Sequence, residues 1–160
     1  YDWRYQGSLL MPRLSQQWQR SGNYSPRLIA AYNGDTLAAT SAFDKYVAPD
    51  IARIALVDFD NDCVGTTLQV ARKLGRKLAG VRLDTSGTMV DKSLLSQMGM
   101  FKPTGVCKEL VHNVRTALDA EGFDYVKNYR FRSDLTPNVS KRFEALKVPV
   151  DTYAVRIQPF

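Results

Sequence analysis

Apolar and polar positions alternate in blocks between residues 54 and 87, and these blocks predict a β-α-β unit. Ile54–Val57 and Leu78–Leu83 are short apolar runs that are typical of buried strands. Between these runs, apolar residues recur at helical spacing, at Val64, Leu68, Ala71 and Leu74. Gly75 marks the expected end of this helix. Two strands joined by one helix in so short a span predict a parallel pair with a right-handed crossover.

Acidic residues follow both predicted strands. Asp58 and Asp60 come directly after the first strand, and Asp84 comes directly after the second. Because the carboxyl ends of parallel strands meet at one edge of a sheet, we expect these carboxylates to lie close together. Open α/β sheets and α/β barrels bind their ligands at this edge. The pattern therefore predicts a candidate site at the carboxyl ends of these two strands.

The remaining blocks extend the pattern to the order β-α-β-loop-α-β-α-β, which predicts a parallel α/β fold. Helices are predicted over residues 36–46, 108–121 and 136–146, and further strands over 123–129 and 148–155. Asp35 or Thr36 is the expected cap of the first of these helices. Residues 88–105 are loop-like, and so long a connection after a strand is typical of a functional segment.

The chain divides into an irregular arm and one domain. Residues 1–27 are rich in aromatic residues, including Tyr24, and weak in periodicity. We expect this arm either to pack on a partner or to lie across its own domain. Residues 28–160 are the predicted catalytic domain, of barrel type. The chain does not begin with Met, so we expect a processed or partial product.

Composition and charge narrow the classes of partner. The 160 residues carry a net charge of +6, which favours anionic ligands such as phosphorylated small molecules. The basic residues are scattered, so no nucleic-acid partner is expected. Cys63 and Cys107 form neither a disulfide framework nor a metal-ligand spacing, which favours reduced thiols in a cytoplasmic protein. No apolar run approaches the length of a membrane span, so no membrane association is expected.

Six segments resemble nicotinate phosphoribosyltransferase and follow one another in that family's order. They span roughly residues 25–155 and read LIAAYNGDTLAATSAFD, ALVDFDND, GVRLDTSGTMVDKSL, MGMFKPTGV, LVHNVRTALDAEGFDYVK and RFEALKVPVDTY. The resemblance implies a partial (β/α) barrel of parallel strands, of the type II phosphoribosyltransferase kind. It implies a glycosyltransferase of NAD biosynthesis that joins nicotinate to phosphoribosyl pyrophosphate and releases nicotinate mononucleotide and pyrophosphate. It also implies Mg²⁺ as cofactor, coupling to ATP in many members, and a homo-oligomer with active sites at dimer interfaces.

The same resemblance assigns roles at the predicted edge. Asp84 would face the ribose or its Mg²⁺, and Arg82 would hold the carboxylate of nicotinate or a phosphate through its planar fork. Asp58 and Asp60 would line the same edge. Two simpler alternatives stay open: Arg82 and Asp84 pair with neighbouring side chains, and Asp58 and Asp60 cap the following helix.

The family's phosphate-contacting loops correspond to altered segments of this chain. In the loop after the third predicted strand, Ser133 and Asp134 stand at the family's phosphate-contacting positions. The bulky run Asn128–Phe131 precedes them. At the end, the family's Gly-Val-Gly is replaced by Ala154, Val155 and Arg156. The small residues of that motif let a phosphate approach the backbone.

A third departure concerns the histidine that is phosphorylated in the ATP-coupled members. The corresponding segment reads Gly22–Arg27 and contains no histidine, and His112 is expected to be a surface or packing residue. Four alternatives follow: a transferase completed by other segments or another subunit, a catalytically degenerate structural or assembly subunit, a sequence with local errors, and, most distantly, a nucleic-acid-binding module.

Overall fold

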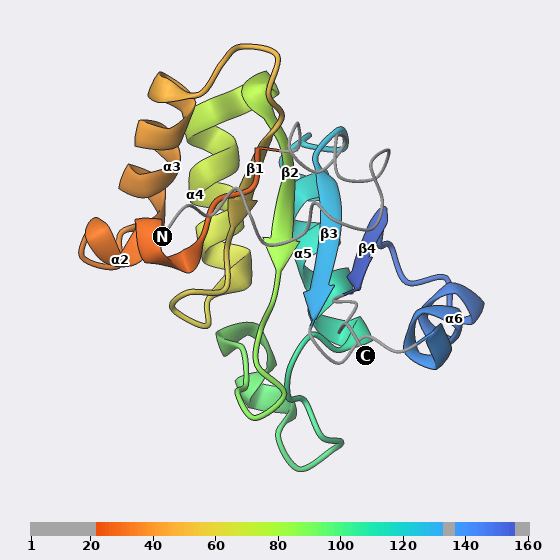
Figure 1. The fold of residues 1–160 in the computed structure, drawn as a ribbon. Coiled ribbons are helices and arrows are strands. Elements are labelled where there is room, and N and C mark those ends of the chain that lie inside the picture. The colour runs from red at the N-terminus through yellow and green to blue at the C-terminus, as the bar shows by residue number, and fades with distance from the viewer. Residues whose placement is uncertain (1–21, 133–136, 156–160) are drawn as a thin grey trace, which may run out of the picture.

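The computed structural model describes residues 22–132 and 137–155, which form one four-stranded parallel sheet with flanking helices (Figure 1). The strands lie side by side in chain order, β1-β2-β3-β4, and every neighbouring pair is parallel. Their bounds are Arg53–Leu56 for β1, Leu78–Leu83 for β2, Lys127–Arg132 for β3 and Thr152–Val155 for β4. The predicted β-α-β unit and the parallel arrangement of its strands are confirmed.

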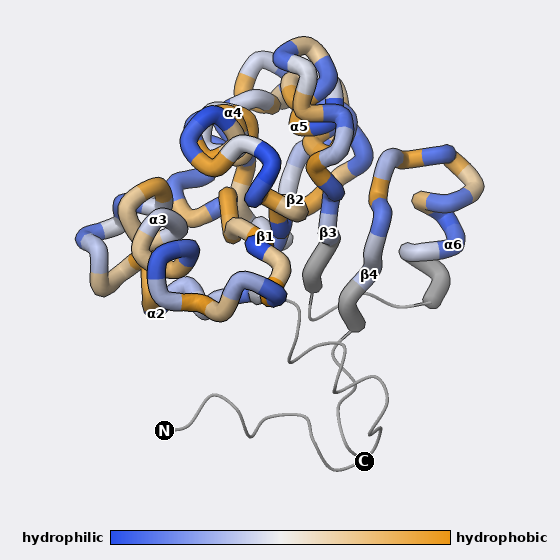
Figure 2. The backbone as a smooth tube through the Cα atoms, turned by 90° about the horizontal axis from the view of Figure 1, so that it is seen from above, coloured by the Kyte–Doolittle hydropathy of each residue, from blue (hydrophilic) through white to orange (hydrophobic). Residues whose placement is uncertain are grey.

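Helices cover one face of this sheet and both of its sides. Figures 1 and 2 show α4 and α5 together on one face, α2 and α3 beyond β1, and α6 beside β4. The α-helices are α2 (Pro26–Ala31), α3 (Thr36–Tyr46), α4 (Cys63–Leu74), α5 (Lys108–Ala120) and α6 (Pro137–Ala145). Two 3₁₀ helices, η2 (Gly75–Lys77) and η3 (Lys92–Gln97), complete the described elements.

Local sequence sets the ends of these helices. The Asp35 carboxylate accepts a hydrogen bond of 2.8 Å from the backbone N–H of Ala38 and caps α3, as predicted. Gly75 ends α4 with a φ of 54°, and Gly122 follows α5 with a φ of 76°. A residue with a side chain would be strained in this left-handed region, so the two glycines stop the helices where expected.

The larger of two apolar clusters joins the sheet to α4 and α5, and the smaller one packs α2 and α3 against β1. On β2, Val81 and Leu83 are buried in the larger cluster, whereas Arg82 between them points to the opposite face, called here the Arg82 face. Among the core residues contributed by the two helices are Cys63, Val70, Ala71, Leu74, Leu110, Val111, Val114 and Leu118. Burial of these side chains is the main force that holds the helices on the sheet.

The predicted helix is confirmed as α4, but the apolar residues that predict it do not coincide with its buried stripe. Leu74 and Ala71 are buried as expected, but Val64 and Leu68 are only half-buried. Thr66 and Thr67 take their places beneath the helix. A threonine methyl group packs against apolar neighbours, so a pattern that counts threonine as polar misplaces the stripe.

Two strands begin later than predicted. Phe123–Val126 form a turn, closed by a hydrogen bond from the Val126 N–H to the Phe123 carbonyl, so β3 starts at Lys127. Pro149 lacks an N–H for the ladder, and β4 starts at Thr152 rather than at Val148. β3 also ends later than predicted, at Arg132 instead of Tyr129, because its last residues pair with β4.

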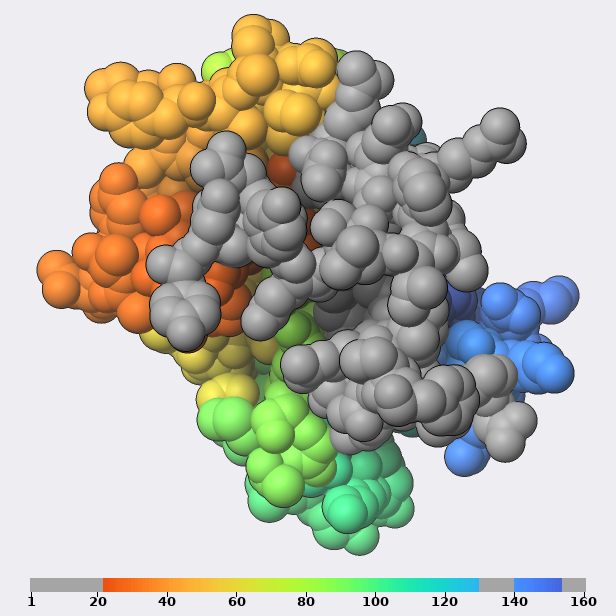
Figure 3. Space-filling model, viewed as in Figure 1, coloured from red at the N-terminus to blue at the C-terminus, as the bar shows by residue number. Residues whose placement is uncertain are grey.

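Residues 88–105 are more ordered than the predicted loop. They contain η3 and return on themselves through an antiparallel bridge between Val90 and Thr104. Figures 1 and 3 show this segment projecting at one end of the molecule. Its exposed apolar side chains are Met89, Leu95, Met98, Met100 and Phe101.

Tyr24 belongs to the predicted arm but packs on its own domain. Its ring is buried, with its centroid 5.2 Å from that of Phe43, and its hydroxyl is hydrogen-bonded to Thr40. Next to it, the backbone of Asn23 forms a parallel bridge with Ile54 along the free edge of β1. No helix in the described part of the chain is long and apolar enough to span a membrane.

Candidate functional site

Arg82 and Asp84 meet at the carboxyl edge of β2. The Arg82 guanidinium donates a hydrogen bond of 2.8 Å to the Asp84 carboxylate and another of 2.8 Å to the side-chain oxygen of Asn23. The Arg82 side chain is 11% exposed and that of Asp84 is 34% exposed. The guanidinium is therefore held in one orientation, while the carboxylate beside it stays accessible to a ligand.

Asp58 lies beside Asp84 and completes a cluster of three charged side chains, Asp58, Arg82 and Asp84, called here the edge cluster. Burial raises the pKa of Asp58 to about 6, and the negative charge of Asp84 adds to this rise. Backbone N–H groups of Asp58 and Asp84 and the charge of Arg82 oppose it. One buried carboxylate oxygen of Asp58, Oδ1, has no hydrogen-bond partner among the described residues. A cation or hydrogen-bond donor from a ligand would satisfy this oxygen.

The alternative in which Asp58 and Asp60 cap α4 is wrong, because Asp62 performs that role. The Asp62 carboxylate accepts a hydrogen bond of 3.0 Å from the N–H of Gly65, and it also forms an ion pair of 3.0 Å with Lys92. Asp60 is exposed on the turn between Asp58 and Asp62. Asp58 is thus left available for the edge cluster.

Asp91 is a structural residue of this edge that the sequence reasoning missed. Its buried carboxylate accepts hydrogen bonds from the N–H of Cys63 at 2.8 Å, the N–H of Ser93 at 2.9 Å and the hydroxyl of Ser93 at 2.7 Å. It therefore ties the segment after β2 to the start of α4. The sequence Asp-Lys-Ser is typical of an aspartate that binds the backbone two residues ahead, which is the signal that could have identified it.

The cysteines do not provide a nucleophile. Cys63 is buried, and burial together with the charges of Asp91 and Asp58 raises the pKa of its thiol far above the usual range. Burial also raises the pKa of Cys107. Both thiols stay protonated, so the chemistry of this edge rests on carboxylates and the guanidinium.

The other predicted site residues lie in the segments after β3 and β4. Ser133 and Asp134 fall outside the described residues. Ala154 and Val155 are the last residues of β4, and Val155 pairs with Arg132 of β3 at the carboxyl edge. Their backbone therefore ends at the same edge as the edge cluster. His112 is exposed on α5, as expected for a surface residue.

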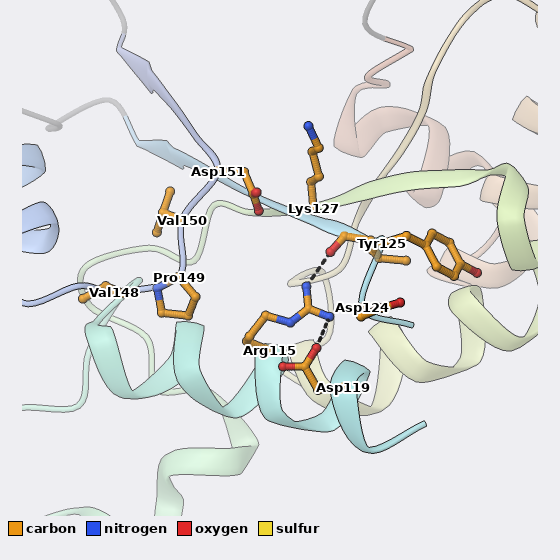
Figure 4. A pocket seen from close by; sticks show the side chains of 10 residues that line it. Arg115, Asp119, Asp124, Tyr125, Lys127, Val148, Pro149, Val150 and Asp151 are labelled. Carbon is orange, nitrogen blue, oxygen red and sulfur yellow. Dashed lines mark hydrogen bonds and ion pairs between the residues drawn. The ribbon is translucent and has the colours of Figure 1, made fainter. Parts of the chain in front are cut away.

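A separate hollow of about 430 Å³ lies at the opposite, amino-terminal edge of β3 and β4 (Figure 4). Two of its charged residues, Arg115 and Asp151, bind backbone groups. Arg115 donates to the carbonyls of Phe123 and Val126 and pairs with Asp119 at 2.7 Å. Asp151 accepts a hydrogen bond of 2.8 Å from the N–H of Asn128. This hollow is called here the amino-edge hollow, and its contacts stabilise the fold.

Comparison with known proteins gives a match among solved structures. No protein-family model matches the chain, and no curated protein matches it. Among solved structures, the chain is similar to the crystal structure of nicotinate-nucleotide pyrophosphorylase from Pyrococcus furiosus, with 31% sequence identity and a TM-score of 0.64. The match covers 84% of this chain but only 30% of that protein. The predicted fold class is confirmed: the chain is an α/β protein whose four parallel strands match part of a phosphoribosyltransferase-like barrel.

Proposed function

We propose that this chain is part of a phosphoribosyltransferase of NAD-precursor metabolism that joins nicotinate to phosphoribosyl pyrophosphate. The observation that carries the proposal is the edge cluster: two carboxylates and an oriented guanidinium at the carboxyl ends of β1 and β2. The similarity to nicotinate-nucleotide pyrophosphorylase supports the reaction class. The matched protein is much longer, so other parts of a longer protein or a second subunit are expected to complete the site.

The chemistry of the transfer suits these three side chains. As the bond from the ribose to pyrophosphate breaks, positive charge develops on the sugar and negative charge on the leaving group. Carboxylates at Asp58 and Asp84 would stabilise the positive charge on the ribose. Arg82 would bind the carboxylate of nicotinate, or a phosphate, by sharing or exchanging its contact with Asp84.

The donor set also fits Mg²⁺ that arrives with the substrate. No group of three or more His, Cys, Asp or Glu side chains that could hold a metal is found among the described residues. Asp84 and the unpartnered oxygen of Asp58 provide two carboxylates, and Mg²⁺ commonly binds through one or two carboxylates plus substrate phosphates. When bound there, the ion would neutralise the charge of the departing pyrophosphate.

The proposed reaction does not use ATP. The resemblance places a phosphorylated histidine where this chain has Gly22–Arg27, and the single histidine of the chain, His112, is exposed on α5. We further propose that the chain self-associates, as the resemblance implies. Sedimentation equilibrium checks this second point, and a monomer at all concentrations tested would contradict it.

The test is a product assay in the presence of Mg²⁺ and phosphoribosyl pyrophosphate. Nicotinate, quinolinate and nicotinamide are supplied in parallel, and nucleotide formation and pyrophosphate release are measured with and without ATP. We expect nicotinate mononucleotide from nicotinate without ATP. Product from quinolinate alone would keep the reaction class and overturn the choice of base, and no product from any base would overturn the proposal.

One observation favours a second candidate, a scaffold subunit without catalysis. Arg82 is already paired with Asp84 and Asn23 of its own chain, as in the simpler alternative drawn from the sequence. In that case the cluster would stabilise the edge of the sheet and bind no substrate. Substitution of Arg82 by Met separates the two candidates, since a scaffold would lose stability, whereas an enzyme would lose affinity for its substrates as well.

A further inference from the structure

Asn23 contacts Arg82 from the far side of β1. The Asn23 backbone forms a parallel bridge with Ile54, so the segment Gly22–Tyr24 runs along the free edge of β1. Arg82 lies on the other side of β1, on β2, where it pairs with Leu56. Its guanidinium donates a hydrogen bond of 2.8 Å from Nη1 to the side-chain oxygen of Asn23. The Arg82 side chain therefore reaches across β1 to a segment that is distant in the sequence.

Contacts on both sides hold Asn23 in place. A Cβ atom at Gly22 would lie 2.1 Å from the carbonyl oxygen of Ala52, so this close approach of two backbones requires glycine. The Gly22 carbonyl accepts a hydrogen bond of 3.2 Å from the N–H of Ile54. On the other side, Tyr24 is buried in the smaller apolar cluster, against α2, α3 and β1. Because both neighbours are fixed, the oxygen of Asn23 is presented to the guanidinium from a rigid backbone.

The acceptors around Arg82 differ in charge. Nη2 donates to the carboxylate of Asp84, whereas Nη1 donates to the neutral amide oxygen of Asn23 and, at 3.5 Å, to the neutral backbone carbonyl of Tyr24. A neutral acceptor orients a guanidinium without cancelling its charge. A carboxylate at position 23 would orient it as well, but would add negative charge to an edge that already holds Asp58 and Asp84.

We propose that Asn23 is a positioning residue, whose neutral oxygen holds the Arg82 guanidinium and leaves its positive charge available to an anionic group of a ligand. That group is the carboxylate of nicotinate or a phosphate of phosphoribosyl pyrophosphate. The inference therefore deepens the proposed function and rests on it for the identity of the ligand. Asn23 acts through Arg82, and the role requires no contact with the reacting atoms.

The test is Asn23→Asp, which keeps the shape of the side chain and adds one negative charge. Affinities of the full chain for nicotinate and for phosphoribosyl pyrophosphate with Mg²⁺ are measured separately by titration calorimetry. We expect the affinity for one of these two ligands to fall about tenfold, because the added charge lies close to the bound anion. The ligand that loses more affinity identifies the anionic group that Arg82 binds. Nicotinamide, which has the same ring without the charge, should bind within twofold of its wild-type affinity.

A second variant, Asn23→Ala, separates this role from a purely structural contact. It removes the acceptor and adds no charge, so the same affinity should fall only about two- to threefold. A purely structural contact would give the reverse order, because Asn23→Asp keeps an acceptor for Arg82 and Asn23→Ala does not. Urea midpoints should follow that reverse order, with Asn23→Asp the more stable variant.

Asn33→Asp is the matched control for net charge. Asn33 is exposed on the turn after α2, and its φ of 56° lies in a region that aspartate also tolerates. The variant adds the same charge to the chain at a position exposed to solvent and screened by salt. Its affinity for both anionic ligands should stay within twofold of the wild-type value.

The inference is overturned if Asn23→Asp keeps both affinities, if Asn23→Ala loses as much affinity as Asn23→Asp, or if Asn33→Asp shows the same loss. It is also overturned if the wild-type chain binds neither anion. These titrations require no turnover. An anion affinity that depends on Asn23, without product, would therefore contradict the transferase alone. Product from the wild-type chain, with no effect of Asn23→Asp on affinity, would contradict the positioning role alone.

Discussion

The two edges of the sheet use charged residues in opposite ways. At the amino-terminal edge, Arg115 and Asp151 bind backbone groups of their own fold beside a hollow of about 430 Å³. At the carboxyl edge, Asp58 and Asp84 repel one another, and a buried oxygen of Asp58 has no partner in the described part of the chain. Arg115 Nε at the amino-terminal edge also lacks a hydrogen-bond partner among the described residues, so one unpaired atom does not distinguish the edges. The comparison teaches that two like charges held side by side, and not the size of a hollow, mark the candidate site.

The largest expected effect is the loss of activity in Asp84→Asn. Removing this carboxylate takes away charge stabilisation next to the ribose, so turnover should fall by roughly 10²- to 10³-fold. Asp124→Asn is the matched control, because it makes the same change beside the amino-edge hollow. Steady-state rates check both variants, and an unchanged rate in Asp84→Asn would remove that residue from its proposed role.

The second effect is a loss of stability without a loss of binding, in Arg115→Met. The Arg115 side chain is 16% exposed and donates to two backbone carbonyls, so its removal leaves buried acceptors unpaired. We expect the free energy of unfolding to fall by about 2–3 kcal/mol, as measured in urea. Affinity for phosphoribosyl pyrophosphate should not change, and a parallel loss of affinity would place a ligand at the amino edge.

The third effect is a pH dependence of stability that comes from Asp58. The fold raises the pKa of Asp58 to about 6, so the folded state holds a proton that the unfolded state has already lost above pH 4. The stabilisation that comes from protonated Asp58 is full below about pH 4 and is lost as the pH rises through 6. The loss is on the order of 3 kcal/mol.

Asp58→Asn cannot ionise at this position, so it isolates the contribution of Asp58. Its free energy of unfolding should exceed that of the wild-type chain at pH 7, and the decline between pH 4 and 7 should be smaller. Urea unfolding at several pH values checks this expectation. Parallel pH profiles in the two proteins would show that Asp58 is not the group responsible.

The smallest effect is expected from Lys127→Ala. This lysine is exposed beside the amino-edge hollow and would attract a phosphate if that hollow were the binding site. We expect stability to change by less than about 0.5 kcal/mol and affinity for phosphoribosyl pyrophosphate to stay within twofold. A tenfold loss of affinity would place the binding site at the amino-terminal edge of the sheet instead of the carboxyl edge.

Much of the fold was predictable because its signals are local. The apolar runs of β1 and β2 and the caps at Asp35 and Gly75 gave the elements and their parallel order. The start of β4 was not predictable from apolar pattern alone, because Val148 and Val150 look like strand residues on either side of Pro149. Their backbone instead turns, with the Val150 N–H bonded to the Val148 carbonyl.

Only the site residues that lie at the ends of strands could be predicted from the sequence. Asp58, Arg82 and Asp84 follow from their places at the ends of strands. Asn23 does not, because it reaches Arg82 through the pairing of segments that are distant in the sequence. A one-dimensional pattern contains no signal for such a neighbour.

The most direct test of the central claim is a calorimetric titration of the chain with phosphoribosyl pyrophosphate and Mg²⁺, alone and with nicotinate. We predict binding near micromolar, about −8 kcal/mol, that weakens strongly in Asp84→Asn and stays unchanged in Asp124→Asn. No binding by the folded chain, or equal binding by both variants, would contradict the claim that the carboxyl edge is the site.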